Sequence, residues 1–167
     1  MQPGDVSAAS DLTGSTVGRF ALRRRLGGGG MREVYLADDT LLKRSVALKR
    51  LSPRLGANER TRQNLRKEAE RASRPNHPGI AAVYDVLEHQ GESFLVMEYV
   101  EGETLRKRMD QPMPAPEFLE LAMQCADALA AAHDRSVLHC DLKPENIMLT
   151  PSGACHSPSQ RERQRSR

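Results

Sequence analysis

Four consecutive glycines (Gly27, Gly28, Gly29 and Gly30) lie between two short runs of strand-forming residues, at 20–26 and 34–36. The glycine loops of Rossmann and Walker nucleotide sites both lead into a helix, and a Walker loop also ends in Gly-Lys followed by Ser or Thr. This chain has no such ending, and its glycines are followed by a strand pattern. The sequence therefore predicts a hairpin whose loop amides can fold over phosphates; a plain flexible turn is the alternative interpretation.

The remaining periodicity predicts an α+β fold with its strands first and its helices later. Strand patterns recur at 46–48, 80–86 and 94–99, and the charged segment 59–74 has the pattern of a helix with a narrow buried stripe. Together with the strands at 20–26 and 34–36, these patterns predict a five-stranded antiparallel sheet plus one helix. Beyond residue 102 the spacing becomes helical, and one apolar stripe is expected at Phe118, Leu121, Cys125 and Leu129.

The residues His139 to Asn146 read His-Cys-Asp-Leu-Lys-Pro-Glu-Asn and match the pattern H-x-D-L-x-x-x-N at every required position. In this pattern Asp141 accepts the proton of a substrate hydroxyl, and Asn146 reaches a metal ion. Lys143 neutralises charge on a phosphoryl group in transfer. We therefore predict Asp141, Lys143 and Asn146 as catalytic residues, with Asn146 also a metal ligand.

Two charged residues further upstream complete a phosphate-binding pattern. Lys49 ends the strand pattern 46–48, and Glu68 lies in the charged segment that follows. As an ion pair they would hold the lysine against the α- and β-phosphates of a nucleotide. Each residue has a plainer interpretation, because a lysine at a strand end and a carboxylate on a charged helix are usually solvated.

From about Val17 to Gly153, the order and spacing of these blocks resemble a bacterial serine/threonine protein kinase of the eukaryotic-like type. The resemblance implies a two-lobed fold that binds ATP and Mg²⁺ and transfers the γ-phosphoryl group to protein Ser or Thr hydroxyls. It places Met97 at the gatekeeper position and Glu98 to Val100 in the hinge that meets adenine through backbone groups. The ATP-binding positions it implies are Leu26, Gly27, Gly28, Gly29, Gly30, Val34, Ala47, Lys49, Glu68, Met97, Glu98 and Val100.

The chain departs from that family at three places. Arg32 stands where the third glycine of the loop is expected, and Cys140 replaces the arginine of His-Arg-Asp. No aspartate follows Asp141, and the only acid after Asn146 is Glu162, so the metal-holding Asp-Phe-Gly triplet is missing. We therefore expect a kinase truncated after its catalytic loop and inactive by itself. The alternatives are a non-catalytic N-lobe module that docks on another kinase chain, and a gene product without a role.

The expected organisation has four parts: a flexible leader (1–17), the kinase N-lobe (18–100), the hinge end with the first C-lobe helices and the catalytic loop (101–153), and a disordered basic tail unlike the family (154–167). The net charge of +3 lies in the last seven residues, so the rest is balanced and no nucleic-acid partner is expected. The chain has three cysteines and no Cys-x-x-Cys pair, which fits a reducing compartment. No apolar run is long enough to span a membrane, and no secretory signal starts the chain, so the expected location is the cytoplasm. The sequence leaves the protein substrate open.

Overall fold

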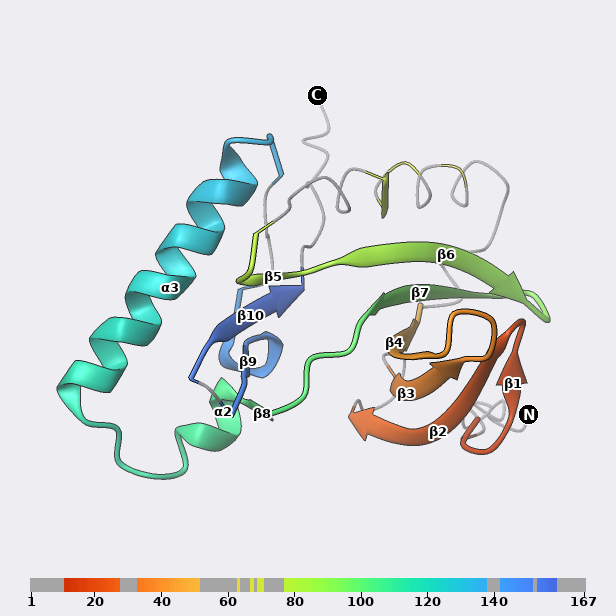
Figure 1. Ribbon diagram of the computed structural model, residues 1–167, viewed down its shortest axis with the longest axis horizontal. Coiled ribbons are helices and arrows are strands. Elements are labelled where there is room, and N and C mark those ends of the chain that lie inside the picture. Colours follow the sequence, from red (N-terminus) through yellow and green to blue (C-terminus); the bar gives the residue numbers. More distant parts are fainter. Residues whose placement is uncertain are drawn as a thin grey trace, which may run out of the picture.

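The computed structural model describes residues 11–27, 33–51, 63, 67, 69–70, 77–137, 142–151 and 153–158. Figure 1 shows a larger sheet at one end of the molecule, a smaller sheet in the middle and a long helix at the other end. The elements are β1 (Thr16–Val17), β2 (Phe20–Gly27), β3 (Val34–Asp39), β4 (Arg44–Arg50), β5 (Ile80–Ala81), β6 (Val83–His89), β7 (Glu92–Glu98), β8 (Glu103–Thr104), α2 (Leu105–Arg108), α3 (Ala115–His133), η2 (Pro144–Asn146), β9 (Met148–Leu149) and β10 (Cys155–Pro158).

The larger sheet has six strands in the order β1-β2-β3-β4-β7-β6, and every neighbouring pair is antiparallel. Its strands alternate, so that one face buries a single apolar cluster while the residues between point to the other face. The members of the cluster are Val17, Phe20, Leu22, Tyr35, Ala37, Val46, Leu48, Phe94 and Val96. The five-stranded antiparallel sheet expected from the sequence is confirmed, and β1 adds a short sixth strand at its edge.

The short strand β1 corrects the expected leader over 1–17. Val17 is almost fully buried in the cluster, and Leu12 packs against it. The backbone N–H of Leu12 also donates to the hydroxyl of Tyr35, over 3.3 Å. The segment from Leu12 to Val17 carries too few apolar residues to show a strand period, yet two of them suffice to anchor it to the sheet.

The helix expected over 59–74 falls largely outside the described residues, Leu65, Glu68 and Ala72 included. The described members Gln63, Lys67, Ala69 and Glu70 are helical. At those positions the structure agrees with the sequence prediction.

The smaller sheet joins distant parts of the chain in the order β5-β10-β9-β8. Its β10 runs antiparallel to β9 and parallel to β5. This strand corrects the described part of the disordered tail expected over 154–167, because residues 155–156 pair with β9, residues 157–158 pair with β5 and Cys155 is buried. Residues 159–167 lie outside the described residues. Backbone hydrogen bonding to two neighbours holds a segment whose sequence shows no strand pattern.

The helix α3 lies beside the smaller sheet (Figure 1). Its buried residues are Leu121, Ala128 and Ala132, which pack with residues of the smaller sheet or its flanks. The kinase resemblance predicts that the apolar stripe of this helix stays exposed here, since the C-lobe helices that would cover it do not follow in the sequence. Phe118 is 59% exposed, as predicted, but Leu121 is buried. The prediction was wrong at Leu121, because β10, a strand the sequence did not reveal, contributes Cys155 to the cluster that buries it. Within the described ranges no helix has the length and apolar character needed to cross a membrane.

Candidate functional site

Four of the predicted ATP-binding residues lie together on the face of the larger sheet opposite its apolar cluster. Val34 on β3 is directly opposite Lys49 on β4, and Ala47 on β4 is directly opposite Met97 on β7. Because their strand neighbours Tyr35, Leu48 and Val96 point into the cluster, alternation places all four on the other face. Ala47 and Met97 are buried, and Lys49 is half-buried. The sheet thus brings one cation and three apolar side chains to a common surface.

The two stems of the glycine loop meet beside that surface. Gly27, the last residue of β2, pairs with Val34, the first residue of β3. The other loop glycines, Gly28, Gly29 and Gly30, lie outside the described residues, as does Arg32. Leu26 precedes the stem glycine on β2 and is half-buried.

A buried carboxylate, Glu33, fixes the stem on the β3 side. Its Oε2 accepts from the Tyr35 hydroxyl at 3.0 Å and from Nη1 of Arg50 at 3.0 Å, and its Oε1 lies 3.4 Å from Nη1 of Arg25. Arg50 forms a further ion pair with Glu92 on β7. Burial, and the Glu33 carboxylate beside it, raise the pKa of Tyr35 above its usual value. The network ties β2, β3, β4 and β7 together near the Gly27–Val34 pair.

Glu98, a predicted hinge residue, forms hydrogen bonds through both its backbone and its side chain. Its N–H donates to the carbonyl of Ala82 over 2.8 Å, and its Oε2 accepts from the N–H of Ala82 over 3.0 Å. Ala82 lies between β5 and β6, and Glu98 ends β7 before the chain passes to β8, so two of the connections between the sheets are bound together. Val100 follows on the segment toward β8 and is half-buried.

The described part of the predicted catalytic loop is the short helix η2 with the residues on either side. Lys143 caps it, and the N–H of Asn146 donates to the Lys143 carbonyl over 2.9 Å. The next residue, Ile147, accepts from the N–H of Leu105 over 2.8 Å, which fastens the loop to α2. Asp141 and Glu68 both lie outside the described residues, so the predicted Lys49–Glu68 pair and the position of the catalytic aspartate stay predictions.

The described residues offer few of the oxygen ligands that Mg²⁺ requires. Mg²⁺ binds through oxygen ligands in octahedral geometry, usually with one or two carboxylates among them. Asn146 offers one neutral amide oxygen, and the described ranges contain no group of three or more His, Cys, Asp or Glu side chains placed to hold a metal ion. Among the described residues, Asn146 alone therefore does not make a magnesium site.

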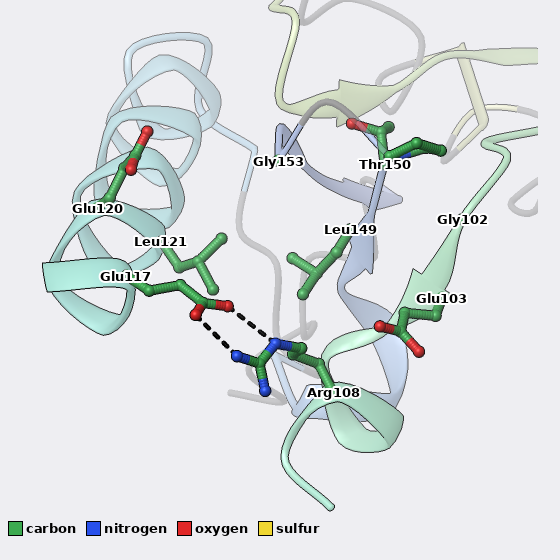
Figure 2. Close-up of a pocket in the computed structure, with 10 residues that line it drawn as sticks. Gly102, Glu103, Arg108, Glu117, Glu120, Leu121, Leu149, Thr150 and Gly153 are labelled. Atoms are coloured by element: carbon green, nitrogen blue, oxygen red, sulfur yellow. Dashed lines mark hydrogen bonds and ion pairs between the residues drawn. The ribbon is translucent and has the colours of Figure 1, made fainter. Parts of the chain in front are cut away.

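A separate pocket of about 560 Å³ lies between α3 and the smaller sheet, and none of the predicted site residues lines it. Figure 2 shows Leu121 and Leu149 pointing toward one another across it, with the Arg108 guanidinium bound to Glu117 at its rim. Both bonds of that pair are short, at 2.8 and 2.7 Å. The lining residues are Gly102, Glu103, Arg108, Glu117, Glu120, Leu121, Leu149, Thr150, Pro151 and Gly153.

Sequence reasoning missed the Glu33 network, the Glu98–Ala82 contacts and this pocket. The charged residues at 25, 33, 50 and 92 look like ordinary surface charges, because nothing in a linear sequence pairs positions that meet only through strand register. Ala82 contributes backbone groups alone, so no side-chain motif could mark it.

Comparisons with known proteins agree with this arrangement. The family described as the protein kinase domain matches residues 20–156. The serine/threonine-protein kinase PrkC of Bacillus subtilis is 39% identical over 138 residues, which cover 81% of this chain and 21% of that protein. The serine/threonine-protein kinase pkn2 of Myxococcus xanthus is 42% identical over 136 residues, 81% of this chain and 16% of that protein.

Among solved structures, the kinase domain of PknI from Mycobacterium tuberculosis superimposes with a TM-score of 0.76 at 32% identity. The match covers 90% of this chain and 62% of that domain. The chain thus spans about a fifth of its curated relatives and less than two thirds of a solved kinase domain. The family match extends to residue 156, three residues beyond the point where the sequence resemblance was expected to end. The fold, the shared sheet surface and these matches lead to one conclusion: the chain belongs to the protein kinase family and is related to bacterial serine/threonine kinases.

Proposed function

We propose that this chain binds ATP on the sheet face that carries Val34, Ala47, Lys49 and Met97, as the nucleotide-binding part of a serine/threonine protein kinase. The observation that carries the proposal is the cross-strand register, which sets Val34 opposite Lys49 and Ala47 opposite Met97. The apolar members offer a surface for a flat base, and the lysine offers a cation for phosphates. The glycine loop, joined to this face by the Gly27–Val34 pair, would cover the phosphates.

The remaining roles in the proposal follow the family pattern. Glu68 positions Lys49, and Glu98 to Val100 meet adenine through their backbone. Leu26 and the glycines from Gly27 to Gly30 close over the nucleotide. Asp141 is the base for the substrate hydroxyl, Lys143 offsets charge on the transferred group, and Asn146 is the metal ligand. The proposed location of the reaction is the ATP-rich cytoplasm, and the acceptors of the γ-phosphoryl group are protein Ser or Thr hydroxyls.

We also propose that these 167 residues by themselves bind ATP weakly and transfer no phosphoryl group to protein. Phosphoryl transfer depends on metal and cationic groups arranged around the γ-phosphate. The only acid after Asn146 is Glu162, so a carboxylate clamp for Mg²⁺ has no evident source. Proton acceptance by Asp141 alone supplies only about 10²–10⁴-fold.

Titration of a fluorescent ATP analogue, with and without Mg²⁺, tests the binding site. We expect weak binding that changes little with Mg²⁺ and is abolished in Lys49→Ala. Lys43→Ala is the matched control, since it removes the same charge from an exposed turn between β3 and β4. Equal binding by Lys49→Ala and Lys43→Ala would refute the site, and micromolar affinity that requires Mg²⁺ would refute the weak-binding proposal.

Incubation with radiolabelled ATP and a generic basic protein tests phosphoryl transfer. We expect no label above that of the Asp141→Asn variant. Label that depends on Asp141 would overturn the proposed inactivity. Joining a family-like C-lobe after Gly153 is expected to restore transfer.

A non-catalytic role is the second candidate, and it is favoured because the described residues contain no group of three or more His, Cys, Asp or Glu side chains that could hold a metal ion. In that case the chain docks on another kinase chain. The expected sign is a change in the activity of that kinase on adding this chain, with Asp141→Asn acting as well as the unsubstituted chain.

A further inference from the structure

Two cysteine sulfurs lie side by side where α3 meets the smaller sheet. The Sγ atoms of Cys125 on α3 and Cys155 on β10 are 3.2 Å apart, and both thiols are free. They belong to the apolar cluster of Leu121, Ile147 and Leu149. Cys155 is buried, whereas Cys125 is half-buried and so can be reached by a small solute. Neither thiol has a part in the proposed nucleotide chemistry.

Other contacts hold the two sulfurs at this separation. The residue before Cys125, Gln124, accepts from the backbone N–H of Cys155 through its Oε1, over 2.7 Å. Its Nε2 donates to the carbonyl of Gly153 over 3.3 Å. One glutamine side chain on α3 therefore binds the turn into β10 on both sides of Ala154, and it holds the two thiols together without a covalent bond between them.

The pKa values of the two thiols are shifted in opposite directions. The hydrogen bond between the two sulfurs lowers the pKa of Cys125 to about 7 despite its partial burial. The same hydrogen bond, with burial, raises the pKa of Cys155. The more accessible sulfur is thus the more nucleophilic one near neutral pH, and the buried partner stays protonated beside it.

We propose that Cys125 and Cys155 form a redox-sensitive dithiol, which a peroxide converts into a disulfide linking α3 to β10. The Cys125 thiolate attacks one peroxide oxygen, the O–O bond breaks, and Cys125 becomes a sulfenic acid as hydroxide leaves. The Cys155 thiol then attacks the Cys125 sulfur, the S–S bond forms, and water leaves with the sulfenic oxygen. Overall the two thiols give two electrons and two protons to the peroxide, which is reduced to water.

The disulfide would link α3 covalently to β10, the strand that joins β5 to β9 in the smaller sheet. The strand β10 pairs with both β5 and β9, and β9 follows directly on the catalytic-loop helix η2. Oxidation should therefore slow hydrogen exchange of the β9 and β10 amides and raise the thermal midpoint of the chain. The effect is independent of nucleotide binding, so the proposal stands or falls separately from the proposed function.

The test is a peptide map of the unsubstituted chain after treatment with equimolar hydrogen peroxide. We expect one cross-linked peptide containing Cys125 and Cys155, a loss of two of the three thiols, and full reversal by dithiothreitol. A map in which these cysteines stay reduced, or link to Cys140 or to another molecule, would overturn the proposal.

Serine variants made in a Cys140→Ser background test the order of the steps. Cys155→Ser leaves the reactive thiol without its resolving partner, so a sulfenic acid trapped by dimedone should accumulate on Cys125. Cys125→Ser leaves only the buried thiol, which should react at least about tenfold more slowly. Equal rates in the two variants, or no trapped sulfenic acid in Cys155→Ser, would contradict the assigned roles.

Discussion

At the scale of single residues, Asp39 is the least exposed carboxylate among the residues that the structure describes. It is 1% exposed at the end of β3, yet its Oδ1 accepts from the N–H groups of Leu41 and Leu42, both at 3.0 Å. Nε of Arg19 donates to the same carboxylate over 3.1 Å. Burial acts to raise the pKa of Asp39, but these donors outweigh it, and the pKa lies below its ordinary value of 3.8.

We predict that Asp39→Asn flattens the acid limb of the stability curve. Because the folded-state pKa is depressed, the ionised form stabilises the fold above the unfolded-state value of 3.8, and this contribution is lost as the pH falls through the folded-state pKa. Urea denaturation between about pH 2 and pH 6 should show unfolding free energy falling less steeply in the variant. Above that window the two curves should run parallel, which serves as the internal control; parallel curves throughout would contradict the assignment.

At the scale of elements, the close approach of β9 to the segment just before β8 depends on one glycine. Gly102 has φ +148°, and a Cβ built on it would lie 1.9 Å from the carbonyl oxygen of Leu149. The next residue, Glu103, pairs with Leu149 as β8 meets β9. Only a residue without a side chain allows the two backbones this close approach.

Gly102→Ala should therefore destabilise the chain by about 3 kcal/mol or more, through backbone strain and overlap together. The matched control is Gly91→Ala, at φ +79° in the turn between β6 and β7, where a Cβ meets nothing within 4 Å. That change should cost only about 1–2 kcal/mol, from conformation alone. Denaturation curves measure both, and equal losses would show that the Leu149 contact is unimportant.

The helix α3 has one buried face and one exposed face, and two leucines two residues apart lie on different faces. Leu121 is 7% exposed and packs in a cluster with Ile147 and Leu149, whereas Leu119 is 59% exposed. Leu121→Ala should cost about 2–5 kcal/mol. Leu119→Ala should change stability by no more than about 0.5 kcal/mol, and it should reduce the binding of a hydrophobic dye. Similar losses in urea denaturation would place both side chains in the core and contradict the structure.

These elements also show how far sequence reasoning reaches. The strands of the larger sheet carry clear alternation, and the sequence alone indicates Lys49 and Met97 as site residues. The burial of Leu121 on α3 could not be predicted, because the strand β10 that contributes Cys155 to its cluster lacks any strand pattern. The Glu98–Ala82 contacts use backbone groups, which every residue shares, so only the folded chain reveals them.

At the scale of the whole molecule, the apolar clusters of the two sheets differ in size. The larger sheet buries nine residues in one cluster, whereas the smaller sheet and α3 share two clusters of four. The strands of the smaller sheet are two to four residues long. Opening should therefore need less free energy on the α3 side.

We predict that limited proteolysis trims the chain to a resistant core that ends near residue 100. The cuts should fall after β7, where the chain leaves the larger sheet toward β8. Mass spectrometry of the fragments identifies the core. A single cooperative melt, with all amides of both sheets exchanging at one rate, would show instead that the two sheets unfold as one unit.

The parallel pairing of β5 with β10 also constrains the order in which the two sheets can form during synthesis. Ile80 is synthesised 77 residues before its partner Ser157, and at 5–20 residues per second this interval is roughly 4–15 s. The strands of the larger sheet all precede β8 in the chain, so this sheet can begin to fold in that interval. The nascent strand Ile80–Ala81 meanwhile lacks its partner, so the synthesis of β10 decides when the smaller sheet closes.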